Sequence, residues 1–171
     1  MPVVSARSYT PLREQHLQRL SEIAAVDRRR FVGQYPQYRT RLICVTLAQG
    51  AALHWVDGRN GVKDLDVWTF YAAYPGERFP WSRRVGHVDF GASDLGRPSY
   101  RNGPRAWQSF EGRRVDLLAR ALPVGRKAEP VEAVCAWLEA ARQPSPRALR
   151  LKPVVMIDPP ALRGHVIWSG A

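Results

Sequence analysis

The segment 64–72, DLDVWTFYA, constrains the fold more than any other part of the sequence. From Leu65 onward it is rich in β-branched and aromatic residues, which is typical of a buried strand. Because successive side chains of a strand point to opposite faces, Asp64 and Asp66 share the face of Trp68. Two unbalanced carboxylates are costly on a face that continues into the core. The fold must therefore balance their charge where this strand begins.

Helical and strand-like patterns alternate along the rest of the chain. Apolar side chains recur at helical spacing over residues 11–30, with Pro11 suited to a first turn, and a short helix is expected over 51–55. The expected strands are 41–48, 64–72, 84–90 and 112–122, followed by a C-terminal helix plus tail over 130–171 that holds one or two edge strands. We expect residues 1–171 to form a single α/β (α+β) domain, with helices packed on a mixed sheet of about four to six strands.

The chain is strongly basic, with a formal net charge of +11 and 26 basic residues, of which 23 are arginine. Because the planar guanidinium group binds phosphate well, this excess indicates a polyanionic partner such as a nucleotide or nucleic acid. A GC-rich genome also replaces lysine by arginine, but it does not explain the shortage of acidic residues. No apolar run is long enough for a membrane span and no secretory signal is recognisable, so we expect a cytoplasmic protein without membrane association.

The two aspartates of the segment 64–72 are spaced as paired metal ligands. Their Cα atoms are expected about 6–7 Å apart, which lets the carboxylates converge on one or two cations. Hard oxygen ligands of this kind favour Mg²⁺ or Mn²⁺ over zinc. The alternative interpretation is an ordinary solvated strand start, in which Lys63 and Arg59 neutralise Asp64 and Asp66.

An anion site is expected next to this cation site. Gly50 and Ala51 follow the strand 41–48 at the start of a short helix, where backbone N–H groups and the helix dipole can hold a phosphate. His54 lies in the same short helix, but single histidines without ligand spacing are more often structural, as we also expect for His87.

A third acid, Asp116, lies within the strand-like segment 112–122. It can complete the metal site, or it can form a buried ion pair with Arg113 or Arg114. Asp89 competes with Asp116 for the role of third ligand. We prefer Asp116, because Asp89 directly precedes Phe90 and a glycine and can instead start a turn.

The order of these features resembles the nucleotidyltransferase superfamily of the DNA polymerase β type. The shared pattern is an apolar strand, a glycine with a small residue, the 12 residues 52–63, an Asp-x-Asp strand and a later single acid. The resemblance covers residues 40–122. This chain has Ala51 where the family commonly has serine or glycine, so a hydroxyl contact to phosphate is missing.

The resemblance implies a role for each matching residue. The expected nucleotide contacts are Gly50, Ala51 and Lys63. The expected catalytic residues and metal ligands are Asp64, Asp66 and Asp116, holding two Mg²⁺ (or Mn²⁺) ions that activate the attacking group and steady the leaving pyrophosphate.

Two functions are consistent with these features. The first is a metal-dependent nucleotidyltransferase that moves a nucleoside monophosphate from a nucleoside triphosphate to an acceptor that the sequence does not identify. The alternative is a non-catalytic nucleic-acid-binding protein that retains the nucleotidyltransferase fold, as Ala51 and the positive charge would suit. In either case the segment 97–107, which mixes arginine with Tyr100 and Trp107, can hold RNA or DNA, or it is a simple surface loop.

Overall fold

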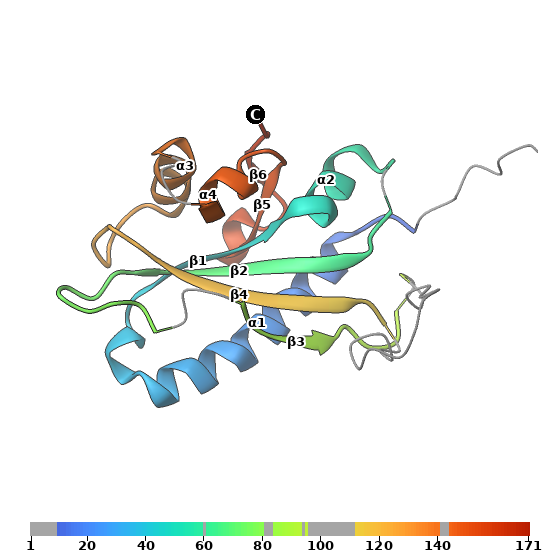
Figure 1. The fold of residues 1–171 in the computed structure, drawn as a ribbon. Coiled ribbons are helices and arrows are strands. Elements are labelled where there is room, and N and C mark those ends of the chain that lie inside the picture. The colour runs from blue at the N-terminus through green and yellow to red at the C-terminus, as the bar shows by residue number, and fades with distance from the viewer. Residues whose placement is uncertain (1–9, 60, 81–83, 94, 96–111, 141–143) are drawn as a thin grey trace, which may run out of the picture.

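The computed structural model describes residues 10–59, 61–80, 84–93, 95, 112–140 and 144–171. Its centre is a mixed six-stranded sheet with helices packed on it, which confirms the expected fold class (Figure 1). In spatial order the strands are β3 (Arg84–Asp89), β4 (Arg114–Leu122), β2 (Asp64–Ala72), β1 (Leu42–Ala48), β5 (Val154–Asp158) and β6 (Val166–Trp168). Four of the five pairings are antiparallel, and the central pairing of β2 with β4 is parallel.

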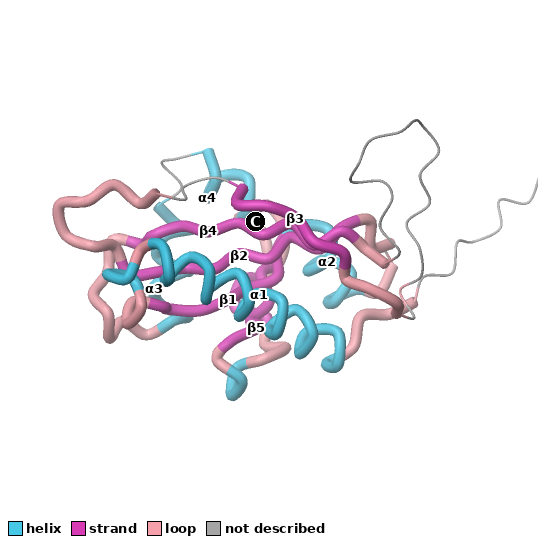
Figure 2. The backbone as a smooth tube through the Cα atoms, turned by 90° about the horizontal axis from the view of Figure 1, so that it is seen from below, coloured by secondary structure: helices cyan, strands magenta, loops and turns pink. Residues whose placement is uncertain are grey.

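One face of the sheet is covered by α1 (Glu14–Gln34), which lies across the strands in Figure 2. The helix places Leu17, Leu20 and Ala24 in a core that it shares with Leu65 and Val67 of β2. Full burial of each leucine stabilises the fold by about 1.5–3 kcal/mol. This contact requires the odd-numbered residues at the start of β2 to face α1, so Asp64 and Asp66 must lie on the other face.

The other face is covered over part of its length by α3 (Pro130–Ala140) and α4 (Pro144–Leu149). Trp68 and Phe70 of β2 are buried there, and the ring of Trp137 meets Phe70 edge-on at 5.3 Å between centroids. The second half of β2 therefore runs into an aromatic core, as its composition predicts. In Figure 1, α3 and α4 lie over one part of the sheet, and α2 (Gln49–Asp57) lies near the other end.

A third cluster of aromatic side chains closes the end of α1. It lies between the last turns of α1, the single-turn helix η1 (Pro36–Tyr38) and the loop that follows β2. Phe31 is its centre, with Tyr38, Tyr71 and Phe79 at centroid distances of 5.4, 4.8 and 5.4 Å. These contacts extend α1 beyond the helical pattern that the sequence predicts.

The structure differs from the expected elements in several details. The first helix begins at Glu14, so Pro11 precedes it instead of lying in its first turn. The strand β5 was expected at an edge, but it lies between β1 and β6, and only β6 is at the edge. The short helices α4 and η3 (Pro160–Leu162) were not expected. Within the described ranges, no helix has the length and apolar character needed to cross a bilayer.

Candidate functional site

The parallel register of β2 and β4 brings the acidic residues together. Asp66 is the direct partner of Asp116, and Asp64 is the partner of Arg114. On the other side of β2, the last residue of β1, Ala48, is the partner of Asp66. Because Val115 and Leu117 of β4 face α1, Arg114 and Asp116 share the opposite face with Asp64 and Asp66. The three aspartates and Arg114 therefore lie on one face at one end of the sheet, where α2 also begins.

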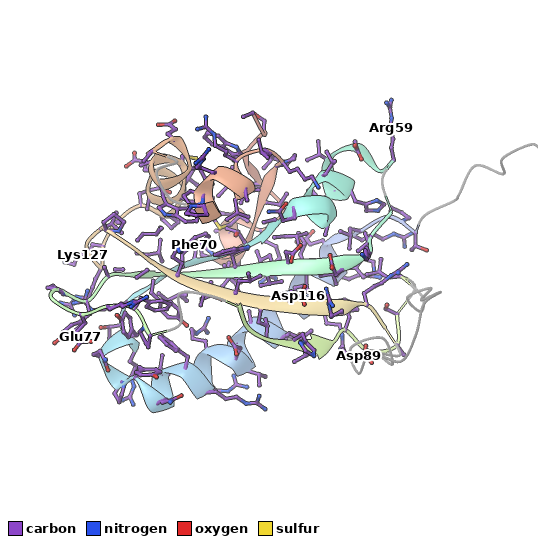
Figure 3. The ribbon with its side chains drawn as sticks, viewed as in Figure 1. Arg59, Phe70, Glu77, Asp89, Asp116 and Lys127 are labelled. Atoms are coloured by element: carbon purple, nitrogen blue, oxygen red, sulfur yellow. The ribbon has the colours of Figure 1, made fainter. Side chains whose placement is uncertain are left out.

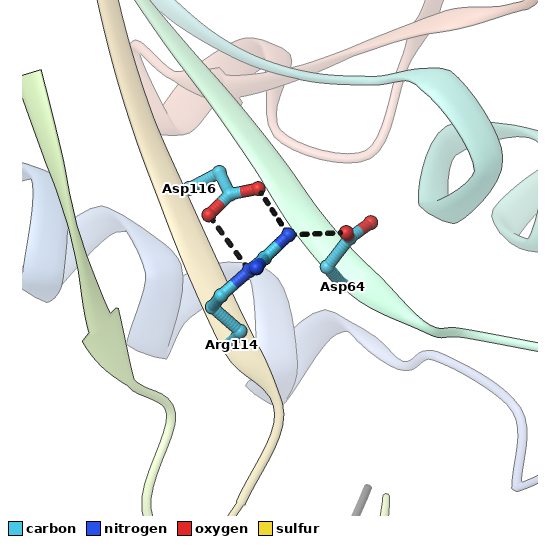
Figure 4. Close-up of polar contacts among 3 residues, drawn as sticks. All are labelled: Asp64, Arg114 and Asp116. Carbon is cyan, nitrogen blue, oxygen red and sulfur yellow. Dashed lines mark hydrogen bonds and ion pairs between the residues drawn. The ribbon is translucent and has the colours of Figure 1, made fainter. Parts of the chain in front are cut away.

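Arg114 is held between two of these acids (Figure 4). Its Nη2 atom lies 3.0 Å from Oδ2 of Asp64 and 3.1 Å from Oδ2 of Asp116, and its Nε atom lies 3.0 Å from Oδ1 of Asp116. The guanidinium group thus donates a hydrogen bond from Nη2 to Oδ2 of Asp116, while its Nε atom makes an ion-pair contact with the other carboxylate oxygen. The buried ion pair with Arg114, one of the two roles considered for Asp116, is confirmed.

Burial makes this ion pair important for stability. The side chain of Asp116 is 7% exposed and that of Arg114 is 13% exposed, whereas Asp64 is 27% exposed. Removing one partner from a buried pair leaves the other charge in a medium that solvates it poorly. The alternation of side chains along β4 therefore places a buried charge pair at the inner side of the site, with Asp64 nearer to solvent.

The start of α2 directly follows Ala48, which is the sheet partner of Asp66. The backbone turns from β1 into α2 at Gln49, whose φ of +60° lies in the left-handed region that non-glycine residues rarely adopt. Such strain occurs preferentially at functional sites. Gly50 is partly exposed, and a Cβ atom added to it would meet no atom within 4 Å. Open space therefore exists for a ligand to approach the first turn of α2.

The other expected nucleotide contacts occupy different environments. Ala51 is 1% exposed and packs in the core beneath α1, so only its backbone can contact a ligand. Lys63 is exposed directly before β2. Asp64 forms its ion pair with Arg114, rather than with Lys63 or Arg59. The backbone N–H of Arg59 donates to Oδ1 of Asp57 in a turn.

Asp89 has the structural role that its sequence context indicates. Its Oδ1 atom accepts hydrogen bonds from the backbone N–H groups of Gly91, at 2.9 Å, and Gly112, at 2.7 Å. These bonds fix the turn after β3 to the entry of β4. Figure 3 shows Asp89 beyond Asp116 at the same end of the sheet. The Asp89 carboxylate is therefore engaged by the two turns, and the preference for Asp116 as the third acid stays a prediction.

The histidines near the site have different environments. His54 is buried, and its Nε2 atom accepts a hydrogen bond from the backbone N–H of Leu12, 3.3 Å away, which ties α2 to the chain before α1. His87 lies exposed on β3 as the direct cross-strand partner of Asp116. Its proximity to the acids was not predicted, because the chain alone does not show which residue of β4 it would face.

Aspartate carboxylates are chemically suitable ligands for a divalent cation, but in this structure those of Asp64 and Asp116 are oriented toward Arg114. In the part of the chain that the structure describes, no three histidine, cysteine, aspartate or glutamate side chains are grouped so that they could hold a metal ion. The carboxylates of Asp64 and Asp116 instead contact Arg114. Carboxylate oxygens are the ligands that Mg²⁺ and Mn²⁺ prefer, but those of Asp64, Asp66 and Asp116 are not grouped around one metal position in this structure. Metal binding stays a prediction.

A cavity of about 370 Å³ lies on the opposite face of the sheet. It is lined by Gln15, His16, Arg19, Phe90, Ala92 and Ser93. The lining residues of α1 and Phe90 belong to the side of the sheet that α1 covers. This cavity is therefore separate from the charge cluster and adds no residue to it.

Comparison of the chain with protein-family models, with curated proteins and with solved structures found no match.

We expect the substitution Arg114→Gln to lower the free energy of unfolding by about 3 kcal/mol, because it leaves the Asp116 carboxylate buried without a counter-ion. Urea denaturation followed by tryptophan fluorescence measures this change. Arg126→Gln is the matched control: Arg126 is exposed and its Nη1 atom lies 3.4 Å from Thr40 Oγ1. The control should change the stability by less than about 0.5 kcal/mol. Equal stabilities for the two variants would contradict the structural role of Arg114.

Proposed function

We propose that this protein is a metal-dependent nucleotidyltransferase that moves a nucleoside monophosphate from a nucleoside triphosphate to an acceptor. The observation that carries the proposal is the register of β2 with β4, which places Asp66 beside Asp116 on the face that also bears Asp64. The same end of the sheet contains the β1–α2 junction with Gly50, next to Ala48, the partner of Asp66. An acidic site and an anion-binding helix start are therefore adjacent, as phosphoryl transfer requires.

The residues have separate tasks in this proposal. Asp64, Asp66 and Asp116 hold the divalent cation, which when bound supplies positive charge that steadies the leaving pyrophosphate. The backbone N–H groups at Gly50 and Ala51 bind a phosphate of the triphosphate, and the dipole of α2 adds to the attraction. Lys63, exposed before β2, adds a positive charge that draws the nucleotide toward the site. A cytoplasmic location, where nucleoside triphosphates are plentiful, is part of the same proposal.

The alternative function is nucleic-acid binding without catalysis. It is favoured by the net charge of +11 and by the ion pair of Arg114 with Asp116, which engages a carboxylate that catalysis would require. The arginine-rich segment 97–107, expected to contact RNA or DNA, lies outside the described residues. The two functions differ in what they require of the aspartates: transfer needs their charge, whereas binding of a polyanion does not.

Incubation with labelled nucleoside triphosphates, Mg²⁺ and a mixed pool of RNA, DNA and protein acceptors should reveal transfer of label by the native protein. We expect Asp66→Asn and Asp116→Asn each to lower transfer by on the order of a hundred-fold or more, because an amide is a weaker ligand for a hard cation. Glu77→Gln, a carboxylate-to-amide change at the opposite end of the molecule, should leave transfer unchanged (Figure 3).

Transfer that survives both aspartate substitutions would disprove the catalytic proposal. RNA binding that weakens steeply with salt, without transfer, would support the alternative function.

Gly50→Ala separates folding from nucleotide binding. Because an added Cβ meets no atom within 4 Å, the variant should fold, with a stability equal to the native protein or up to about 1 kcal/mol higher. The methyl group would lie where the phosphate is expected to approach, so nucleotide affinity should fall by about ten-fold, or 1.4 kcal/mol. Gly33→Ala, in α1 and equally free of contacts, is the control. Titration with a fluorescent nucleoside triphosphate and Mg²⁺ measures the affinity, and equal affinities in all three proteins would exclude Gly50 from the binding site.

A further inference from the structure

The cavity of about 370 Å³ on the α1 side of the sheet lies between the first turns of α1 and the turn that follows β3. Small-molecule sites in proteins have volumes of about 300–1,000 Å³, so this cavity is at the lower end of their range. It therefore has room for a small metabolite rather than for a macromolecule.

Arg19 is held at this cavity by contacts with the turn after β3. Its Nε atom donates a hydrogen bond to the backbone carbonyl of Phe90, and its guanidinium group lies over the ring of Phe90, 5.3 Å from the centroid. Its Nη2 atom lies against Gly91, where an added Cβ atom would be only 2.7 Å from it. Gly91 has a φ of +86°, which suits glycine, so the turn leaves this space open. The guanidinium group is thus oriented in advance, which lowers the cost of binding a ligand.

The positive charge of Arg19 is not balanced at this cavity. Within the described residues, no carboxylate forms an ion pair with Arg19, whereas Arg114 and Arg163 are each paired with an aspartate. Of the described residues that line the cavity, none is acidic. The first turns of α1 add the positive end of the helix dipole. The cavity therefore favours an anionic ligand.

Ser93 supplies a second donor in the lining. Its Oγ atom is buried and has no hydrogen-bond partner among the groups that the structure describes. A buried hydroxyl group without a partner is costly, and a bound anion would satisfy it. His16 has a structural role in the same wall: it is 3% exposed, and its Nδ1 atom accepts a hydrogen bond of 2.8 Å from the backbone N–H of Arg13. The donors for a ligand thus come from α1 and from the turn after β3.

We propose that this cavity binds a small phosphomonoester, with its phosphate group held between Arg19 and Ser93. The Nη atoms of Arg19 donate charge-assisted hydrogen bonds, the Ser93 hydroxyl group donates another, and the exposed amide of Gln15 adds a further donor. A phosphate group suits donors from two segments better than a carboxylate does, because it has three terminal oxygens. The cavity is separate from the charge cluster of Asp64, Asp66 and Asp116, so this inference does not depend on the proposed function.

Ser93→Ala separates ligand binding from folding. Because the hydroxyl group has no partner in the described structure, its removal should leave the melting temperature unchanged or slightly higher. The affinity for a phosphomonoester should nevertheless fall by about ten-fold, since a hydrogen bond to a charged group is lost. A lower melting temperature with an unchanged affinity would show that the hydroxyl group serves the fold, and would overturn the proposal.

Titration with inorganic phosphate and with glycerol 3-phosphate, followed by the backbone amide chemical shifts of the protein, tests the site itself. Both probes should shift the amides of Gln15 and Ser93, and glycerol 3-phosphate should bind more tightly because its organic part fills more of the cavity. Succinate, which carries carboxylates only, should bind more weakly than either probe. Both phosphate probes should also raise the melting temperature of the native protein.

Arg19→Gln should lower the affinity for glycerol 3-phosphate by about ten-fold or more. Arg29→Gln is the matched control, because Arg29 is exposed on the same helix about 15 Å further along it. Arg29→Gln and Gly50→Ala should both bind like the native protein, which distinguishes this site from the phosphate contact proposed at α2.

Arg19→Lys keeps the test decisive if the glutamine variant does not fold. Lysine retains the charge but lacks the planar fork, so it cannot both bond Phe90 and present two donors to a phosphate, and its affinity should also fall. Equal affinities of the native protein and the folded Arg19 variants, tighter binding of succinate than of phosphate, or shifts confined to the start of α2 would each overturn the proposal.

Discussion

The parallel pairing of β2 with β4 is the constraint on which the rest of the site depends. It fixes which side chains become neighbours: Asp66 with Asp116 in one row and Asp64 with Arg114 in the row before it. A shift of β4 by one residue would move Arg114 and Asp116 toward the α1 face, where Val115 now lies in the core. The hydrophobic core beneath α1 and the charge cluster above it therefore specify the same register.

This arrangement divides β2 into two functional halves. Its first residues carry charge on the face away from α1, whereas Trp68 and Phe70 carry aromatic rings into the core beneath α3. In Figure 3, Asp116 lies toward the end of the molecule that bears Asp89, whereas Phe70 lies toward the end that bears Glu77 and Lys127. Carboxylates at the edge of a buried core need a positive charge nearby. In this structure Arg114 provides that charge to Asp64 and Asp116.

The fold was predictable where local patterns decide it, as the bounds of β2, expected and found at Asp64–Ala72, illustrate. The position of β5 was not, because strand order depends on long-range pairing that periodicity does not encode. The same distinction applies to the site. The common face of Asp64 and Asp66 follows from alternation alone, but the choice of Arg114 over Arg113 follows from the face of β4 that α1 covers. Arg113 instead donates from Nε to the backbone carbonyl of Leu95, 3.2 Å away.

A crystal structure with Mn²⁺ and a non-hydrolysable nucleoside triphosphate tests the central claim most directly, because the anomalous signal of manganese locates the ion independently of its surroundings. The account predicts a peak between the aspartates, with carboxylate oxygens of Asp66 and Asp116 at about 2.0–2.6 Å, and a phosphate at the first turn of α2. A structure with the nucleotide bound elsewhere and no manganese peak at the aspartates would contradict it.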